Sequence, residues 1–346
     1  MIEEGTPQKT PLSQLGEFGL IRHLTQAVTL KNPGSRTGVG DDSAVLSFPE
    51  NTEVLVTKDL LMEGVHFDLS YTPLKHLGYK AIVVNVSDIY AMGGTPTQVL
   101  IGLAVSNRFP VEALEELYLG MFLACEHYGV DLVGGDTTSG HQGLTLSVTA
   151  LGHVPAGGAI LRSGAQPNDL IVVSGDLGGA FMGLQILERE KVAYRANPNV
   201  QPELQGHEYV LERQLKPEAR KDIIALLAAL EVRPTAMIDI SDGLSSELIH
   251  LCTASGTGCK VFEDKFPIDP AVLRLAEEFG VNPITAALNG GEDYELLFTV
   301  SLSNWEKIKA NPSLTVIGHM TATPETQLIT TAGQAIELKA QGFTHA

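Results

Sequence analysis

Five acidic motifs are spread along this chain, and their residue types favour chemistry with divalent cations. They are Gly40-Asp41-Asp42-Ser43, Thr57-Lys58-Asp59, Ser87-Asp88, Gly134-Gly135-Asp136-Thr137 and Asp239-Ile240-Ser241-Asp242-Gly243. Most of them follow a run of β-branched and aliphatic residues, where a buried strand is expected to end. Carboxylates brought together repel one another unless cations lie between them, and Mg²⁺ usually takes one or two carboxylates together with substrate phosphates. The motifs therefore predict a metal-dependent enzyme that acts on phosphates.

Each motif taken alone also has a plainer interpretation. Asp41 and Asp42 are typical of a loop turn, and Asp59 and Asp242 are each compatible with a helix cap. Asp88 is harder to explain in this way, because it falls within an otherwise apolar helix, where an unpaired charge is costly. Taken together, the five motifs favour a shared metal site.

The composition excludes several classes of protein. The chain has 346 residues, a length typical of about two domains. Its formal net charge of −18 argues against binding to nucleic acid or to an anionic membrane surface, both of which need clustered Lys and Arg. The acidic start of the chain lacks the apolar segment of a secretory signal, and no apolar run reaches the ~18 residues of a membrane span. We therefore expect a soluble, cytoplasmic protein whose cysteines, Cys125, Cys252 and Cys259, are reduced and buried.

The elements that must position the motifs can be predicted from apolar periodicity and from Gly and Pro. The pattern predicts helices at residues 15–30, 77–92, 111–128, 217–230 and 244–254. It predicts strands at residues 44–48, 54–57, 99–105, 131–133, 144–152, 171–174, 236–240 and 294–300. A Pro/Gly-rich break at residues 154–158 is the expected boundary between an N-terminal domain, 1–153, and a C-terminal domain, 154–346, each of mixed α/β or α+β character. The polar residues 189–215 are expected to form an exposed loop or insertion.

Several common phosphate and nucleophile motifs are absent from the sequence. It contains no Gly-x-x-x-x-Gly-Lys-[Ser/Thr] loop, no protein-kinase motif set, no Gly-x-Ser-x-Gly elbow and no His-Glu-x-x-His helix. The glycine-rich residues Gly175–Gly179 before an expected helix allow two interpretations. Their backbone N–H groups could cradle a phosphate, or the glycines could only permit close packing of strand and helix, which we favour.

The motifs, in their order along the chain, resemble the thiamine-monophosphate kinase family over nearly its full length. Besides the acidic motifs, the resemblance rests on a Glu-Gly-Val-His-Phe segment at 63–67, a stretch from Tyr79 to Gly94, and Arg162-Ser163-Gly164. It also rests on the Gly-Gly-Glu-Asp-Tyr-Glu turn at 290–295 and on Gly342-Phe343. Several of these motifs are shared by the wider aminoimidazole ribonucleotide synthetase superfamily, whereas the 63–67 segment and the 290–295 turn are more kinase-like.

The resemblance implies a fold, an activity and a set of site residues. The fold would be the two-domain fold of the aminoimidazole ribonucleotide synthetase superfamily, as a homodimer whose N-terminal sheets pair across the dimer. The activity would be ATP-dependent phosphorylation of thiamine monophosphate to thiamine diphosphate. The implied Mg²⁺ ligands are Asp41, Asp42, Thr57, Asp59, Asp88, Asp136, Asp239 and Asp242. The implied nucleotide contacts are Gly135, Asp136, Arg162 and Ser241, and the implied substrate contacts are His66, Glu292 and Phe343.

One residue departs from the family pattern. Lys58 stands where many members carry a small hydroxyl residue that helps to hold metal, which puts a side-chain contact there in doubt, although not a backbone carbonyl contact. Alone, Arg162 is equally compatible with a surface arginine, Glu292 with a turn cap and Phe343 with a core residue.

The expected chemistry needs no general base. The acceptor is the phosphate of thiamine monophosphate, whose second pKa lies near ~6, so that it is already an anion at neutral pH. The obstacle is repulsion between two polyanions, which several Mg²⁺ ions would neutralise. Two alternatives remain: another ATP-dependent enzyme of the same superfamily, and an acidic divalent-metal-binding protein without turnover.

Overall fold

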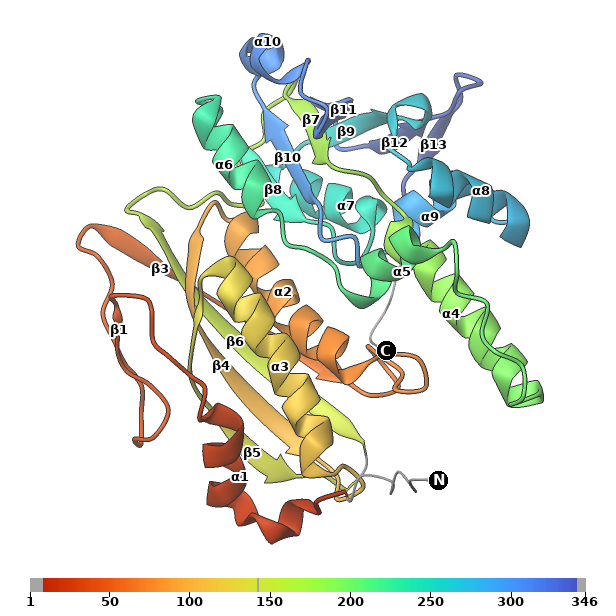
Figure 1. Ribbon diagram of the computed structural model, residues 1–346. Helices are drawn as coiled ribbons and strands as arrows, with labels where there is room; N and C mark the ends of the chain where they lie inside the picture. The colour runs from red at the N-terminus through yellow and green to blue at the C-terminus, as the bar shows by residue number, and fades with distance from the viewer. Residues whose placement is uncertain (1–8, 142, 341–346) are drawn as a thin grey trace. The chain divides into compact units, whose positions relative to one another are not determined.

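The computed structural model describes residues 9–141 and 143–340, which separate into two compact units (Figure 1). The N-terminal unit contains the residues up to Ile89 together with Thr95–Gly157. The C-terminal unit contains Tyr90–Gly94 and the residues from Gly158 onward. The boundary at Gly157 falls inside the Pro/Gly-rich break of the sequence, and the short segment Tyr90–Gly94 joins the second unit.

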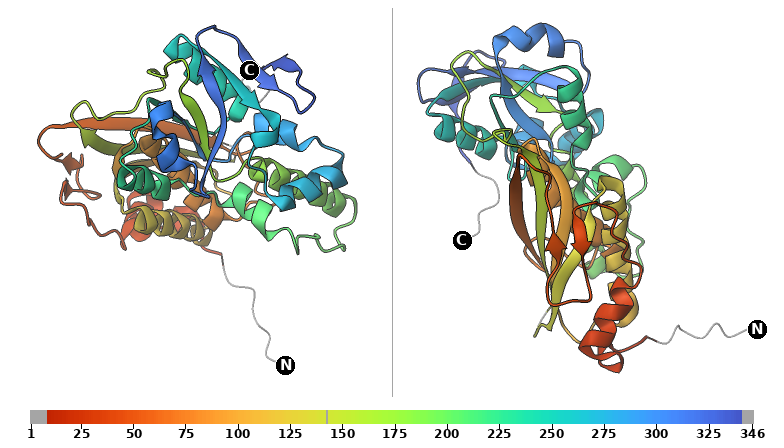
Figure 2. Two further views of the ribbon diagram at one scale, coloured as in Figure 1. Left: turned by 90° about the horizontal axis from the view of Figure 1, so that it is seen from above. Right: turned by 90° about the vertical axis from the view of Figure 1, so that its left-hand side faces the viewer.

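A sheet of four strands in the order β3-β6-β4-β5 forms the centre of the N-terminal unit. The strands are β3 (Thr52–Met62), β4 (Thr95–Val105), β5 (Asp131–Ser139) and β6 (Leu144–Pro155). Helices α2 (Leu74–Ala91) and α3 (Val111–Tyr128) lie on one face of this sheet (Figures 1 and 2). The remaining elements of this unit are α1 (Gly16–Thr25), a 3₁₀ turn at Leu12–Gln14, and the strand pair β1 (Ser35–Thr37) and β2 (Val45–Leu46).

The two helices pack so closely that glycine is needed at their contact. A Cβ atom at Gly78 of α2 would lie 1.9 Å from the carbonyl oxygen of Leu117, and one at Gly120 of α3 would lie 1.8 Å from the carbonyl oxygen of Lys75. Neither position can hold a larger residue without moving a backbone. The close approach fixes α2, which carries Asp88, against α3.

Strand β3 is amphipathic, and its apolar side chains on one face are exposed. Leu55 and Leu61 are buried, whereas Val54, Val56, Leu60 and Met62 are each exposed by 46% or more. Residues of a strand alternate between the two faces of the sheet. One face of β3 is therefore buried beneath the helices, and the other presents apolar side chains outward along an edge strand.

A sheet of seven strands in the order β13-β12-β9-β11-β7-β10-β8 forms the centre of the C-terminal unit. The strands are β7 (Leu170–Ser174), β8 (Ala236–Asp239), β9 (Gly258–Phe262), β10 (Leu296–Val300), β11 (Leu314–Thr321), β12 (Thr326–Ile329) and β13 (Ala335–Glu337). The helices are α4 (Gly179–Ala196), α5 (Glu208–Leu215), α6 (Lys221–Ala229), α7 (Leu244–Ser255), α8 (Pro270–Phe279), α9 (Pro283–Asn289) and α10 (Trp305–Ile308), with 3₁₀ turns at Glu263–Lys265 and Leu302–Asn304.

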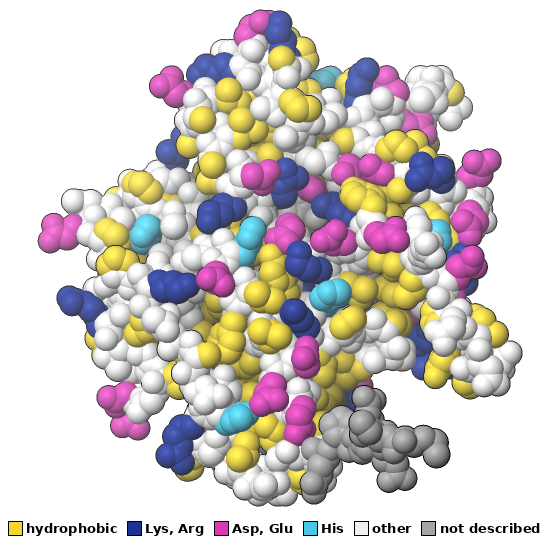
Figure 3. Space-filling model, in the orientation of Figure 1, with side chains coloured by type: hydrophobic (Ala, Val, Ile, Leu, Met, Phe, Trp, Pro, Cys, Tyr) yellow, Lys and Arg dark blue, Asp and Glu magenta, His cyan; other side chains and the backbone are white. Residues whose placement is uncertain are grey.

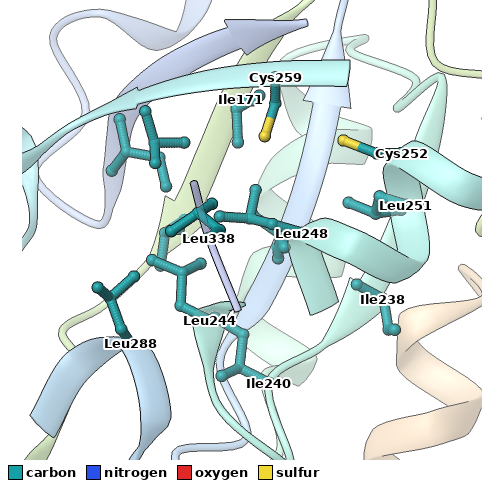
Figure 4. Packing of buried hydrophobic residues seen from close by; sticks show 14 of the residues in the cluster. Ile171, Ile238, Ile240, Leu244, Leu248, Leu251, Cys252, Cys259, Leu288 and Leu338 are labelled. Atoms are coloured by element: carbon teal, nitrogen blue, oxygen red, sulfur yellow. The ribbon is translucent and has the colours of Figure 1, made fainter. Parts of the chain in front are cut away.

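Helix α7 contributes much of the core of this unit. Its Leu244, Leu248 and Leu251 pack with Ile171 of β7 and Ile238 of β8, and all of these side chains are buried (Figure 4). The packing holds the start of α7, and hence the loop between β8 and α7, in place. The three cysteines are free and buried, as expected from the sequence.

The structure corrects several predicted elements. Only residues 197–207 of the predicted loop at 189–215 lie outside helices, because α4 continues to Ala196 and α5 begins at Glu208. The helix predicted from Pro217 begins only at Lys221. Thr57 and Asp59 lie in the middle of β3, and Asp136 lies within β5, so these motifs do not mark strand ends. Long pairing with neighbouring strands extends both elements beyond their apolar runs.

The surface agrees with the composition. On the face shown in Figure 3, acidic and basic side chains are interspersed, and the described residues form no continuous basic surface there. No helix within residues 9–141 and 143–340 is both long and apolar enough to cross a bilayer. The cytoplasmic location stays a prediction.

Candidate functional site

Three of the predicted site residues meet where β3 lies against α2. The Thr57 hydroxyl donates a hydrogen bond of 2.5 Å to Oδ2 of Asp88. The backbone N–H of Asp59 donates to Oδ1 of Asn85, 3.1 Å away, and the Asn85 amide in turn donates to the carbonyl of Ala81. Because Thr57 and Asp59 are two residues apart on a strand, both side chains project from the same face. The sheet and the helix thus bring Thr57, Asp59 and Asp88 together.

The electrostatics of this group favour a bound cation. Burial and, to a smaller extent, the negative charge of the nearby Asp88 together raise the pKa of Asp59 to about 6. Burial and repulsion each disfavour a negative charge on Asp59 while Asp88 is ionised. A divalent cation bound to both carboxylates would offset both effects. The two carboxylates are therefore suited to Mg²⁺.

Lys58 points away from this group. It is exposed, and strand alternation places it on the opposite face from Thr57 and Asp59. The departure from the family pattern at this residue therefore leaves the carboxylate pair intact.

Asp136 lies on the other edge of the same sheet. The register aligns Asp59 with Val148, Val148 with Ile101, and Ile101 with Gly135, the neighbour of Asp136. Three strand spacings of roughly 4.8 Å place the two edges about 14 Å apart along the sheet. Gly135 itself must be glycine, because a Cβ atom there would lie 2.0 Å from the carbonyl oxygen of Ile101.

The remaining predicted residues of the N-terminal unit lie in loops. Asp41 and Asp42 are exposed, and Asp41 accepts a hydrogen bond of 2.8 Å from the backbone N–H of Asp42. The backbone N–H of Met62 donates to Nδ1 of His66 at 3.0 Å. A neutral His66 ring with this bond carries its proton on Nε2.

In the C-terminal unit, the loop from β8 to α7 carries the second acidic group. Asp239 ends β8 and is 4% exposed, whereas Asp242 is exposed. Glu247, which the sequence interpretation missed, accepts a hydrogen bond of 2.9 Å from the backbone N–H of Asp242. Burial, together with the negative charges of Asp242 and Asp239, raises the pKa of Glu247 to about 8. This loop too gathers carboxylates that disfavour one another's charge.

The Gly290–Glu295 turn lies against the loop that contains Ser241. The N–H of Glu292 donates to the carbonyl of Ser241 at 2.7 Å, and the N–H of Tyr294 donates to the carbonyl of Ile240 at 2.9 Å. Glu292 and Tyr294 have φ values of +59° and +52°, in the left-handed region that non-glycine residues rarely adopt. Such backbone strain persists only where surrounding contacts hold it, and it is common at functional sites.

Two arginines that the sequence interpretation missed hold this turn. Nη1 of Arg213, on α5, lies 2.9 Å from Oε1 of Glu295, and Arg220 pairs with Oε2 of the same carboxylate. The sequence shows both arginines as basic residues in a polar stretch before α6. Nothing in the sequence, however, indicates that they pair with a turn some 80 residues later.

The glycine-rich segment Gly175–Gly179 serves packing in this structure. The N–H of Gly178 donates to Oδ2 of Asp293 at 2.9 Å, so an internal carboxylate occupies the start of α4. A Cβ atom at Gly175 would lie 2.3 Å from Oε1 of Glu295. Arg162 is exposed, and Phe343 lies outside the described residues.

The residues fit Mg²⁺ as partial sites. No group of three or more His, Cys, Asp or Glu side chains within residues 9–141 and 143–340 is placed to hold a metal ion by itself. Mg²⁺ is usually bound through one or two carboxylates and completed by phosphates and water. The Asp59–Asp88 pair, with the raised pKa of Asp59, supplies such a partial site.

Known proteins resemble this chain over almost its whole length. A family model described as AIR synthase related protein, N-terminal domain, matches residues 40–154. The thiamine-monophosphate kinase of Bacillus subtilis (strain 168) is 34% identical over 337 residues, which are 96% of this chain and 99% of that protein. The chain belongs to the thiamine-monophosphate kinase family. This confirms the resemblance and the enzyme class that the sequence motifs indicate.

Solved structures confirm the fold. The structure of AaThiL complexed with AMPPCP and TMP matches with a TM-score of 0.74 at 32% identity, over 96% of this chain and 98% of that chain. A thiamine-monophosphate kinase from Stenotrophomonas maltophilia K279a matches with a TM-score of 0.75 at 32% identity, over 91% and 95% of the two chains. The fold is therefore that of the aminoimidazole ribonucleotide synthetase superfamily, in a mixed α/β chain.

Proposed function

We propose that this chain transfers the γ-phosphoryl group of ATP directly to the phosphate of thiamine monophosphate, giving thiamine diphosphate and ADP. The observation that carries the proposal is the pairing of Asp59 and Asp88, where burial and like charge raise the pKa of Asp59 to about 6. A carboxylate pair of this kind is typical of a site that binds Mg²⁺ together with phosphates. The AMPPCP and TMP bound to AaThiL supply the two ligand types.

The residues of the chain act mainly by binding and orienting. The acceptor phosphate is an anion at neutral pH, so no side chain has to remove a proton from it. Thr57 orients Asp88 through its hydroxyl, and Asn85 fixes the backbone of Asp59. When bound, Mg²⁺ supplies positive charge that offsets the repulsion between the two sets of phosphates. The ligands that we propose for it are Asp41, Asp42, Thr57, Asp59, Asp88, Asp136, Asp239 and Asp242.

We propose that nucleotide and substrate contact different residues. The nucleotide contacts are Gly135, Asp136, Arg162 and Ser241, with the Arg162 guanidinium suited to a bidentate phosphate bond. The substrate contacts are His66, Glu292 and Phe343. A carboxylate at Glu292 favours the fixed positive charge of the thiazolium ring, and the Nε2–H of a neutral His66 can donate to an oxygen acceptor.

We propose that the active form is a homodimer. The exposed apolar side chains of β3, which include Val56 and Leu60, are suited to burial against a second copy. Asp59 and Asp136 lie on opposite edges of one sheet, so two paired sheets offer a way to bring the β5 edge of one copy to the β3 edge of the other. A site completed in this way would need both copies.

The decisive experiment measures thiamine diphosphate formed from thiamine monophosphate by the purified protein. Formation should require both ATP and Mg²⁺, and one ADP should appear for each thiamine diphosphate. Loss of the product on chelation with EDTA, and its return with added Mg²⁺, would support the metal assignment. Tight metal binding without any turnover would favour the acidic metal-binding protein instead and would overturn the proposal.

A further inference from the structure

Helix α5 reaches the proposed substrate turn through adjacent residues. Nε2 of Gln214 donates to Oε2 of Glu292 at 2.8 Å, and Arg213 beside it pairs with Glu295. The Tyr209 hydroxyl, one turn earlier on the helix, donates to Oδ1 of Asp176. Helix α5, which the sequence pattern predicts to be part of a loop, thus contacts the Gly290–Glu295 turn.

The buried ends of the turn are held by charged bonds. Glu295 is 1% exposed and accepts hydrogen bonds from Arg213, Arg220 and the Ser174 hydroxyl. Asp293, also 1% exposed, accepts from the N–H of Gly178. These contacts fix the backbone on the C-terminal side of Glu292 and keep it in its left-handed conformation.

The bond from Gln214 to Glu292 is of a different kind. Gln214 is 7% exposed and donates a neutral amide N–H, whereas Glu295 is bonded by guanidinium groups. A neutral donor orients a carboxylate without cancelling its charge, and a cation in the same place would do both. The Gln214 amide therefore orients the Glu292 carboxylate without itself cancelling the negative charge.

We propose that Gln214 is a specificity-determining positioning residue for the substrate. Its amide holds the Glu292 carboxylate in the orientation that meets the positively charged ring of thiamine monophosphate. This inference rests on the proposed function, in which Glu292 contacts that substrate. Gln214 acts through Glu292 and does not itself touch the reacting atoms.

The test compares Gln214→Met with Gln201→Met. Methionine matches glutamine in length and suits the buried position but cannot donate the bond. Gln201 is an exposed glutamine in the same α4–α5 connection and serves as the control. In Gln214→Met we expect KM for thiamine monophosphate to rise about tenfold, the effect typical of losing a hydrogen bond to a charged group. The kcat and the Kd of AMPPCP should each stay within about twofold of wild type, as should every constant of Gln201→Met.

A neutral analogue separates orientation of charge from general damage to the pocket. The monophosphate of 4-methyl-5-(2-hydroxyethyl)thiazole carries the phosphate but no fixed positive charge. Its inhibition constant should change by less than about twofold in Gln214→Met. The proposal would be overturned if Gln214→Met weakened the binding of thiamine monophosphate and of the neutral analogue equally, or weakened neither.

Two further variants keep the test decisive. In Glu292→Gln, adding Gln214→Met should weaken substrate binding no further, because both changes act on one contact; additive losses would refute the link. Gln214→Lys supplies a donor but cancels the charge, so it should also lose preference for the cationic substrate, and it carries the test if the methionine variant does not fold. Retained preference in Gln214→Lys would overturn the role of the neutral amide. If the wild-type protein makes no thiamine diphosphate, the proposed function fails. If the wild-type protein is active and the Gln214 variants behave like it, only the role of Gln214 fails.

Discussion

Replacing Arg213 with methionine is expected to destabilise the C-terminal unit by about 3 kcal/mol at pH 8. Arg213 donates to Glu295 Oε1 at 2.9 Å and to the carbonyl of Asp176 at 2.9 Å, and it lies 3.5 Å from Oδ1 of Asp293. Removing one partner from a buried ion pair typically costs about 3–5 kcal/mol, because a charge is left uncompensated. Glu295 keeps its bonds from Arg220 and Ser174, which places the expected loss at the lower end.

The loss should depend on pH. Burial raises the pKa of Asp293 from 3.8 to about 6 even though Arg213 lowers it, so this carboxyl group favours the folded state below pH 3.8 and loses that contribution as the pH rises through 6. Without Arg213 the folded-state pKa rises further. The cost of ionising Asp293 in the variant is therefore greatest above pH 7 and small where the group is protonated. We expect the loss to be at least about 1 kcal/mol smaller at pH 5 than at pH 8.

Urea unfolding followed by tryptophan fluorescence measures the loss of stability of the C-terminal unit. The chain has a single tryptophan, Trp305, which lies in the C-terminal unit. Arg189→Met is the control, because Arg189 is a third exposed and one of its two partners, Glu278, is also exposed. Its loss should stay below about 1 kcal/mol. A loss of that small size in Arg213→Met, or an equal loss at pH 5 and pH 8, would refute the reasoning.

Other changes address the site and the assembly. Asp88→Asn should abolish formation of thiamine diphosphate with little change in thermal unfolding, because it removes a metal-binding charge; activity within threefold of wild type would make Asp88 merely structural. Glu292→Gln should weaken thiamine monophosphate and leave AMPPCP nearly unchanged in calorimetric titrations, and equal weakening of both ligands would remove Glu292 from the substrate pocket. Val56→Lys should turn the dimer into a monomer in sedimentation at micromolar concentration, whereas a wild-type monomer would contradict the dimer. Mixing inactive Asp59→Asn and Asp136→Asn chains should restore part of the activity if two copies complete one site, and no recovery would place both residues of a site in one chain.

The sequence by itself determined the chemistry and most of the central elements. Helix α3 runs from Val111 to Tyr128 as predicted, because apolar periodicity covers its length and Gly129 ends it with a φ of +71°. The type of ligand was also predicted from the sequence, since carboxylates in five motifs, three of which contain glycine, indicate divalent cations and phosphates. These signals are local: each depends on residues that are neighbours in the chain.

Tertiary structure decided which of these residues meet. Strand β3 extends to Met62 because it pairs with β6 along its whole length, and this places Thr57 and Asp59 against Asp88 instead of at a strand end. The same pairing sets Asp136 on the opposite edge of the sheet. No periodicity in the sequence encodes such a register between strands.

The clearest example is the segment around Gln214. Its polar residues indicate a loop, because sequence patterns identify a helix by its apolar face, and α5 instead buries an amide and a guanidinium. These groups are stable there only because Glu292 and Glu295, 78 and 82 residues away, supply the acceptors. A polar residue can be recognised as buried only when its partner is known, and that partner is fixed by the fold.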